Sequence, residues 1–259
     1  MNYLVGTNIK MYRTWLEANQ WLADMDRDVP ESPLVDVALF PPYFSLVGAS
    51  ERIHKKNIGF GPQNMGWEDR GPFTGEISPL MIKELGCRYV ELDHHERRLY
   101  FNENDRMVNQ KAALALAHGL RPLVCVGEDA GYKDNGLEAF LTEQMNAILS
   151  GLKLNDPANL IIAYEPRWAI GQAEAASAEY AGRCCDLIRA RLRHFFKFGD
   201  EIRIIYGGSV TLDDAPAMLA HPNINGLFIG RAALDTATFA RAVELAHRQV
   251  EMDEAGIRA

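Results

Sequence analysis

Short apolar segments alternate along the chain with longer segments in which apolar residues recur at helical spacing. Eight short segments are rich in β-branched or aromatic residues, and several are apolar almost throughout, as strands covered on both faces should be. The pattern therefore predicts a mainly parallel sheet. The expected strands are Tyr3–Asn8, Val35–Phe40, Ile58–Asn64, Tyr89–Asp93, Pro122–Gly127, Leu160–Tyr164, Ile202–Tyr206 and Leu227–Gly230.

Helical patterns lie between these strands. The segment from Ser78 to Gly86 has a capping residue, a proline in the first turn and a terminal glycine, as helices often do. Residues 186–196 mix charged and apolar positions at helical spacing. A further apolar stripe, with spacings of four, four and three, is formed by Leu137, Leu141, Met145 and Ile148.

Eight strands that alternate with helices favour βαβ units with right-handed crossovers. Eight such units in about 250 residues match the size of a (β/α)8 barrel. A doubly wound open sheet is the main alternative, but the G-x-G-x-x-G turn after its first strand is absent. No repeat, low-complexity tract or linker divides the chain, so we expect one α/β domain over residues 1–259.

Composition narrows the class of protein. Of 259 residues, 47% are hydrophobic, which excludes intrinsic disorder, and a net charge of −8 argues against nucleic-acid binding. Four cysteines form no C-x-x-C pair or metal-ligand spacing, and we expect free thiols in a reducing compartment. The sequence has no signal-peptide pattern and no apolar run of roughly 18 residues, so we expect a cytoplasmic protein without membrane contact.

Residues at the carboxyl ends of barrel strands face the active site. Taken singly, each of these positions also has an ordinary structural explanation, as a cap, a turn or a solvated side chain. Their joint placement at the strand ends indicates a site. The residues are Asn8 and Lys10 after the first strand, His94 and His95 after the fourth, Glu165 after the sixth, Gly207, Gly208 and Ser209 after the seventh, and Gly230 and Arg231 after the eighth.

The types of these side chains suggest acid–base chemistry on an anion. Buried among apolar groups, Glu165 would have its pKa raised toward the range of a general base. At a helix N-terminus, the imidazole of His94 or His95 would stay neutral and could donate an N–H to a carbonyl. Glycine turns after the last two strands let backbone N–H groups converge on a phosphate. The small residues around Gly171 are typical of a lid.

Six motifs occur in one order along nearly the whole chain. They resemble those of the triosephosphate isomerase family. The motifs are Asn8-Ile9-Lys10-Met11, Gly61–Asn64 with Phe73-Thr74-Gly75-Glu76, His94-His95-Glu96-Arg97-Arg98, Cys125-Val126-Gly127-Glu128, Ala163–Gly171, and Tyr206-Gly207-Gly208-Ser209.

The resemblance implies a TIM-barrel enzyme that isomerises a small sugar phosphate through an enediolate, without a metal or organic cofactor. Glu165 would move the carbon-bound proton, while neutral His94 polarises the carbonyl. Lys10 would stabilise negative charge, Asn8 would hold substrate oxygens, and Glu96 would position Lys10 or relay protons.

The same resemblance assigns the phosphate, the lid and a second subunit. Closure of residues 166–176 would exclude water from the intermediate. A homodimer is implied in which the Thr74-Gly75-Glu76 loop reaches the partner near Asn8 and Lys10. Backbone amides of Gly171, Ser209, Gly230 and Arg231 would bind phosphate. The lid and its hinge would involve Pro166, Trp168, Tyr206, Ser209 and Glu128.

Several positions depart from the family pattern. Asp93 and His95 replace a glycine and a serine around His94, and a carboxylate there would favour the protonated ring unless it points away. Arg167 replaces a small apolar lid residue, and Arg231 replaces a glycine. Residues Gln172-Ala173-Glu174-Ala175 replace the usual T-G-K-T.

Substrate length stays open between three and four carbons. Three segments are similar to those of a catabolic branch that converts L-erythrulose 1-phosphate to D-erythrulose 4-phosphate. A sugar-phosphate-binding barrel without catalysis is a further alternative. A Schiff-base aldolase would need a lysine at an interior strand position, and none is expected. The branch-like segments are Asn64–Trp67, Ile77–Met81 and Phe228–Arg231.

Overall fold

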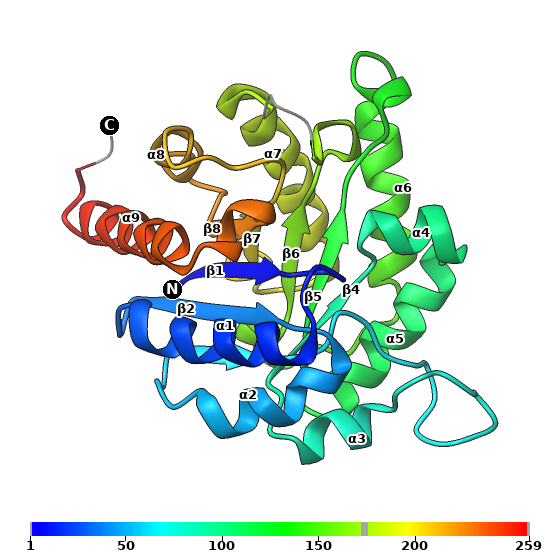
Figure 1. The fold of residues 1–259 in the computed structure, drawn as a ribbon. Coiled ribbons are helices and arrows are strands. Elements are labelled where there is room, and N and C mark those ends of the chain that lie inside the picture. Colours follow the sequence, from blue (N-terminus) through cyan, green and yellow to red (C-terminus); the bar gives the residue numbers. More distant parts are fainter. Residues whose placement is uncertain (1, 172–175, 258–259) are drawn as a thin grey trace.

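The computed structural model describes residues 2–171 and 176–257, and in them eight parallel strands form a barrel (Figure 1). The hydrogen-bonded order is β3-β2-β1-β8-β7-β6-β5-β4. Pairing of β1 with both β2 and β8 joins the two ends of the chain in one sheet, which confirms the barrel over the doubly wound alternative. The strands are β1 (Tyr3–Asn8), β2 (Val35–Phe40), β3 (Ile58–Phe60), β4 (Tyr89–Leu92), β5 (Arg121–Val126), β6 (Ile161–Tyr164), β7 (Arg203–Tyr206) and β8 (Gly226–Ile229).

The ring closes between β3 and β4 through single hydrogen bonds rather than a regular ladder. The Arg88 amide donates to the Phe60 carbonyl, and the Glu91 amide donates to the Pro62 carbonyl, each at 3.0 Å. The predicted strand through Asn64 was therefore too long. Pro62 has no amide hydrogen to donate to a ladder, so the chain leaves the sheet after Phe60.

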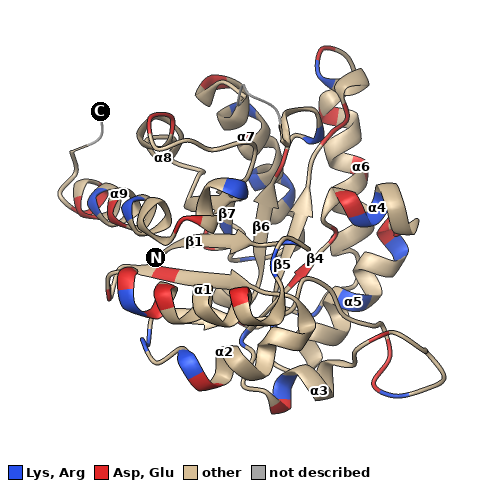
Figure 2. Cartoon of the chain, in the orientation of Figure 1, with Lys and Arg blue, Asp and Glu red and all other residues tan. Residues whose placement is uncertain are grey.

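The helices surround the barrel, and charged residues lie mostly on the helices and loops rather than on the strands (Figure 2). The expected stripe forms α6, in which Leu141, Met145 and Ile148 are buried. Ser78 caps α3 by accepting a hydrogen bond from the Met81 amide, as predicted. The helices are α1 (Trp15–Asp28), α2 (Leu46–Arg52), α3 (Pro79–Glu84), α4 (His95–Phe101), α5 (Asp105–Ala117), α6 (Leu137–Leu149), α7 (Ala178–Phe195), α8 (Ala215–Leu219) and α9 (Thr236–Glu254).

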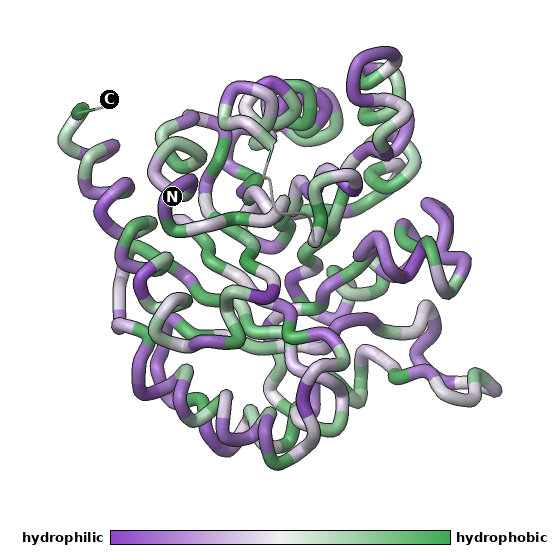
Figure 3. Tube along the Cα trace, turned by 45° about the horizontal axis from the view of Figure 1, so that its top comes forward, coloured by the Kyte–Doolittle hydropathy of each residue, from purple (hydrophilic) through white to green (hydrophobic). Residues whose placement is uncertain are grey.

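Apolar residues form a large layer between strands and helices and a second cluster inside the barrel, and the strands are correspondingly hydrophobic in Figure 3. Among the described residues, no helix combines the length and hydropathy that a membrane span requires. All four cysteines are buried free thiols. The interior cluster consists of Leu4, Ala38, Phe40, Tyr89, Leu123, Cys125, Ile161, Ala163, Ile205 and Phe228.

Candidate active site

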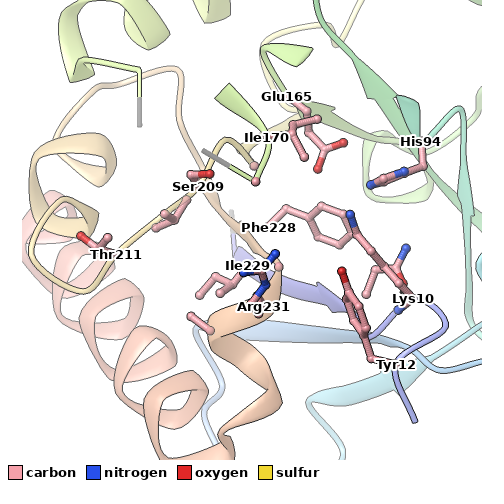
Figure 4. Close-up of a pocket in the computed structure, with 16 residues that line it drawn as sticks. Lys10, Tyr12, His94, Glu165, Ile170, Ser209, Thr211, Phe228, Ile229 and Arg231 are labelled. Carbon is pink, nitrogen blue, oxygen red and sulfur yellow. Dashed lines mark hydrogen bonds between the residues drawn. The ribbon is translucent and has the colours of Figure 1, made fainter. Parts of the chain in front are cut away.

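A cavity of about 260 Å³ opens at the carboxyl ends of the strands (Figure 4). It brings together predicted residues from five separate strand ends, so the side chains expected to act on one substrate share one space. The lining residues are Asn8, Lys10, Tyr12, His94, Glu165, Ile170, Gly171, Gly207, Ser209, Val210, Thr211, Phe228, Ile229, Gly230, Arg231 and Ala232.

Glu165 follows β6 directly and is buried beside this cavity. Burial raises the pKa of its carboxyl to about 7, against the lowering effects of the Lys10 charge and a hydrogen bond from the Cys125 thiol. Among the described residues, none donates a hydrogen bond to its Oε2. A carboxyl with this pKa and a free oxygen can both accept and return a proton near neutral pH.

The neighbouring glycine keeps room for this carboxyl. A Cβ added to Gly207 would lie 2.7 Å from Glu165 Cγ, closer than nonbonded carbon atoms approach. The absence of a side chain at Gly207 therefore leaves space for the Glu165 side chain, in addition to any role of the Gly-Gly turn in anion binding.

His94 caps the N-terminus of α4 and points into the cavity beside Glu165 (Figure 4). Burial lowers the pKa of its ring well below the usual range, and the Lys10 and His95 charges lower it further. Its Nδ1 accepts a hydrogen bond of 3.2 Å from the Glu96 amide. A neutral ring that accepts at Nδ1 carries its proton on Nε2, where it can be donated.

Asp93 points away from His94. Its backbone lies in the left-handed region, with φ of 65°, and β4 therefore ends one residue earlier than predicted. Both oxygens of its carboxylate accept hydrogen bonds from the Arg98 guanidinium in an ion pair. The Oδ2–Nη2 distance is 2.6 Å. Burial raises the pKa of Asp93 to about 6, opposed by Arg98. Asp93 is therefore not expected to favour the protonated form of His94, because the positive charge of Arg98 balances the negative charge of the Asp93 carboxylate.

Lys10 is held in place by its contacts with three residues. Its Nζ lies 2.6 Å from Glu96 Oε1. Its amide donates to Asn8 Oδ1 at 2.5 Å, and its carbonyl accepts from Gln63 Nε2 at 3.1 Å. These bonds fix a backbone that has φ of 50°, an unfavourable conformation for lysine.

Of the predicted phosphate residues, Ser209 and Arg231 lie across the cavity from His94 (Figure 4). Gly171, Ser209, Gly230 and Arg231 all line it, and the exposed Arg231 side chain adds a cation to the rim. Ser209 adopts φ of 47°, and its hydroxyl donates to the Ala169 carbonyl at 2.7 Å. This hydrogen bond links the loop after β7 to the lid.

Both described ends of the lid are anchored. After Pro166, Trp168 Nε1 donates to Glu128 Oε1 at 2.8 Å. At the other end, the Ala176 amide donates to the Tyr206 hydroxyl at 3.1 Å. The predicted lid partners therefore contact the lid, whereas the unusual residues Gln172-Ala173-Glu174-Ala175 lie outside the described part of the chain.

Three departures from the family pattern meet behind Glu165. Asp93, His95 and Arg167 line one small cavity of about 10 Å³ together with Glu165 and Cys125. Burial lowers the pKa of His95, and its Nδ1 has no hydrogen-bond partner among the described residues. These three departures from the family pattern are far apart in the sequence but line the same space beside Glu165, the candidate base.

Sequence reasoning missed several residues that complete the site. Gln63 holds the Lys10 carbonyl, Tyr12 lines the cavity, and Glu91 accepts a hydrogen bond of 2.6 Å from Asn8 Nδ2. The available signal for Glu91 was a carboxyl inside an apolar strand, on the same face as Tyr89.

A parallel eight-stranded barrel whose strand ends present a buried carboxyl, a neutral imidazole and an ammonium group defines an α/β-barrel enzyme. Residues 3–246 match the family model described as triosephosphate isomerase. A triosephosphate isomerase of Chloroflexus aurantiacus is 40% identical over 243 residues, covering 93% of this chain and 97% of that protein. Those of a Synechococcus strain and Acaryochloris marina are 40% and 41% identical, over 93% and 92% of this chain and 95% and 97% of their own lengths. The chain belongs to the triosephosphate isomerase family, which are isomerases of the intramolecular oxidoreductase class.

Proposed function

We propose that this protein interconverts dihydroxyacetone phosphate and glyceraldehyde 3-phosphate. One observation carries the proposal: Glu165 and His94 line the same cavity, with a carboxyl that titrates near neutral pH beside an imidazole that stays neutral. The names of the similar proteins support the same substrate pair.

In the proposed mechanism, the Glu165 carboxylate removes a proton from the carbon next to the substrate carbonyl. The electron pair of that C–H bond forms the carbon–carbon double bond of an enediolate, and the carbonyl electrons move onto oxygen. His94 Nε2–H donates a hydrogen bond to this oxygen, and the Lys10 ammonium stabilises its negative charge. A proton then moves from the hydroxyl oxygen on the carbon that lost its hydrogen to the former carbonyl oxygen: His94 Nε2 gives its proton to the former carbonyl oxygen and takes one from the hydroxyl. Protonated Glu165 returns its proton to the former carbonyl carbon, and the oxygen that lost its proton becomes the new carbonyl, which completes the isomerisation.

The phosphate group would anchor the substrate at the other end of the cavity. Backbone amides of Gly171, Ser209, Gly230 and Arg231 are candidates to bind it. Closure of the lid over this group would keep water from the enediolate, which otherwise can expel its phosphate.

The variant Glu165→Gln tests the assigned base. We expect turnover to fall by roughly 100- to 10,000-fold, because an amide cannot accept the proton. Affinity for inorganic phosphate should stay within about twofold, since the phosphate residues are untouched. Unchanged turnover would refute the role of Glu165.

Two other functions are separated by simple assays. A barrel that only binds sugar phosphates would incorporate no deuterium into dihydroxyacetone phosphate in heavy water, whereas the proposed enzyme should. An aldolase would form a Schiff base that borohydride traps as a covalent adduct, and we expect none.

A four-carbon substrate is the second candidate, favoured by the three branch-like segments Asn64–Trp67, Ile77–Met81 and Phe228–Arg231. The proton transfer between adjacent carbons would be the same. Parallel measurement of kcat/KM on glyceraldehyde 3-phosphate and L-erythrulose 1-phosphate decides between them. A large preference for the latter would replace our proposal.

We also propose a homodimer. The loop between β3 and α3, which contains Thr74, Gly75 and Glu76, projects from the body of the molecule (Figure 1). A second, more apolar cavity of about 530 Å³ adjoins Asn8 and Lys10 and includes the exposed side chains of Met11, Phe44 and Phe101. In a two-fold dimer, the projecting loop of each subunit can enter the apolar groove of the other, so one molecule must carry both features.

A further inference from the structure

Glu91 is a fully buried carboxyl inside the barrel, with an exposed fraction of 0%. Its side chain shares the interior face of β4 with Tyr89. Its Oε2 accepts a hydrogen bond from Asn8 Nδ2 at 2.6 Å, and the Cys125 thiol lies 4.0 Å from its Oε1. Within residues 2–171 and 176–257, no lysine, arginine or histidine forms an ion pair with it.

Burying a carboxyl without a cation is unfavourable, because the group loses its hydration without a matching charge. Its register partner on β5, Leu123, belongs to the apolar cluster of the barrel interior, where an apolar side chain would pack without this penalty. Packing therefore does not account for a glutamate here, and its hydrogen bond to Asn8 is the contact that distinguishes it from an apolar residue.

A continuous path of short hydrogen bonds leads from Glu91 to the cavity. Glu91 holds the amide nitrogen of Asn8, while the Asn8 oxygen accepts from the Lys10 backbone at 2.5 Å. Lys10 in turn contacts Glu96 at 2.6 Å. The two partners of the Asn8 amide fix which of its ends points to Lys10 and which to the barrel interior.

We propose that Glu91 is a positioning residue for the reaction: its carboxyl fixes the Asn8 side chain and, through Asn8, the strained backbone of Lys10 at the floor of the cavity. The inference deepens the proposed function and rests on it. Loss of the Glu91 contact leaves the Asn8 side chain held by the Lys10 amide alone, and small displacements of such groups reduce catalysis strongly.

The ionisation of Glu91 gives the role a second signature. Its pKa is raised to about 8, mainly by burial and also by the charges of Glu165 on the loop after β6 and Glu96 on α4. The hydrogen bond from Asn8 at the end of β1 and the Lys10 charge act in the opposite direction. The Cys125 thiol on β5 also faces it. Glu91 is therefore mostly neutral at pH 7. Above about pH 8 it gains a negative charge near the developing enediolate, which should reduce kcat.

Two variants separate position from charge. Glu91→Gln keeps an oxygen that can accept from Asn8 but cannot ionise, so kcat near pH 7 should stay within about threefold and the decline above pH 8 should disappear. Glu91→Leu removes the acceptor, so kcat should fall by roughly 10- to 100-fold with a smaller change in KM. The control Ile205→Val alters the same interior cluster without touching Asn8, and should leave both parameters within about twofold.

A binding assay makes the test independent of turnover. 2-Phosphoglycolate, whose carboxylate resembles the planar, charged enediolate, should bind Glu91→Leu at least about tenfold more weakly, while the affinity for inorganic phosphate should not change. If the wild-type protein lacks isomerase activity, the proposed function fails, but this binding assay still tests the positioning role of Glu91. Equal 2-phosphoglycolate affinity in folded Glu91→Leu overturns the inference. If Glu91→Leu does not fold, Glu91→Gln decides instead: a decline of kcat above pH 8 equal to that of the wild type would overturn the inference.

Discussion

The ionisation of Glu165 depends mainly on the loss of water around it. Burial raises its pKa, and the nearby Lys10 charge limits that rise to about 7. The same burial lowers the pKa of His94, because it disfavours the charged form of both side chains, which is the carboxylate of Glu165 and the protonated ring of His94. One buried cavity thus provides a weak base and a neutral hydrogen-bond donor side by side.

This balance predicts the titration of Glu165 in the unliganded protein. Carbon-13 NMR of labelled glutamate should show a carboxyl that titrates near pH 7, and Glu165→Gln identifies the signal by its absence. Activity should accordingly fall below about pH 7, as Glu165 becomes protonated and can no longer accept a proton. A midpoint at the ordinary value of 4.5 would contradict the desolvation argument.

Residues at strand ends could be predicted from sequence, because the barrel rule and the family motifs select the same positions. Glu165, His94 and Lys10 were found in this way. Glu91 was not, because alternation along β4 shows that two faces differ but not which one points into the barrel. Gln63 was missed because it follows a strand that ends earlier than its apolar run suggested.

At the scale of elements, the start of the lid is tied to the loop after β5. Arg167 Nη1 donates to Asp129 Oδ2 at 2.9 Å, and the Arg167 amide donates to the Glu128 carbonyl. Asp129 is 58% exposed, so this ion pair should contribute less than about 1 kcal/mol to stability. Its effect should instead be seen in the opening of the lid.

The variants Arg167→Val and Asp129→Asn break the same ion pair from its two ends. We expect each to change kcat by about two- to fivefold with little change in melting temperature, because the hinge loses an anchor and the core does not change. Lid opening can be followed by the fluorescence of Trp168. A change in Arg167→Val alone would show that the side chain at the hinge, not the ion pair, matters.

Element boundaries were predicted less well than the elements. The strands β1 and β2 have the expected bounds, since their apolar runs end where the backbone leaves the sheet. The strand β4 stops before Asp93, because a left-handed residue with an ion pair to Arg98 turns the chain there. Tertiary contacts of this kind leave no periodic signal in the sequence.

Over the whole molecule, buried carboxyls make stability depend on pH. Burial raises the pKa values of Asp93, Glu165 and Glu91 to about 6, 7 and 8, from 3.8, 4.5 and 4.5. Buried His94 and His95, whose pKa values are lowered, oppose this effect below about pH 6.5. From about pH 6.5 to 8 the folded state therefore binds more protons than the unfolded chain, and the free energy of unfolding should fall as pH rises. Urea unfolding at pH 5, 6.5 and 8.5 measures this, and Glu91→Gln should flatten the dependence.

The proposed dimer is tested at its projecting loop. Thr74→Arg places a charge on an exposed loop, so the monomer should fold normally while association weakens. Light scattering should report half the molar mass at micromolar concentration, together with lower activity, because the apolar groove adjoins Lys10. The control Asn135→Arg alters another exposed loop and should stay dimeric. A dimer that persists in Thr74→Arg would exclude this interface.

The four buried thiols give the protein internal reporters of its own opening. Cys125 lies inside the barrel, Cys184 and Cys185 lie on α7, and Cys87 precedes β4. Burial raises the pKa of every one of them, so a thiol-specific alkylating reagent should find no reactive thiolate in the closed fold. The order in which they become alkylated would show which wall of the barrel separates first.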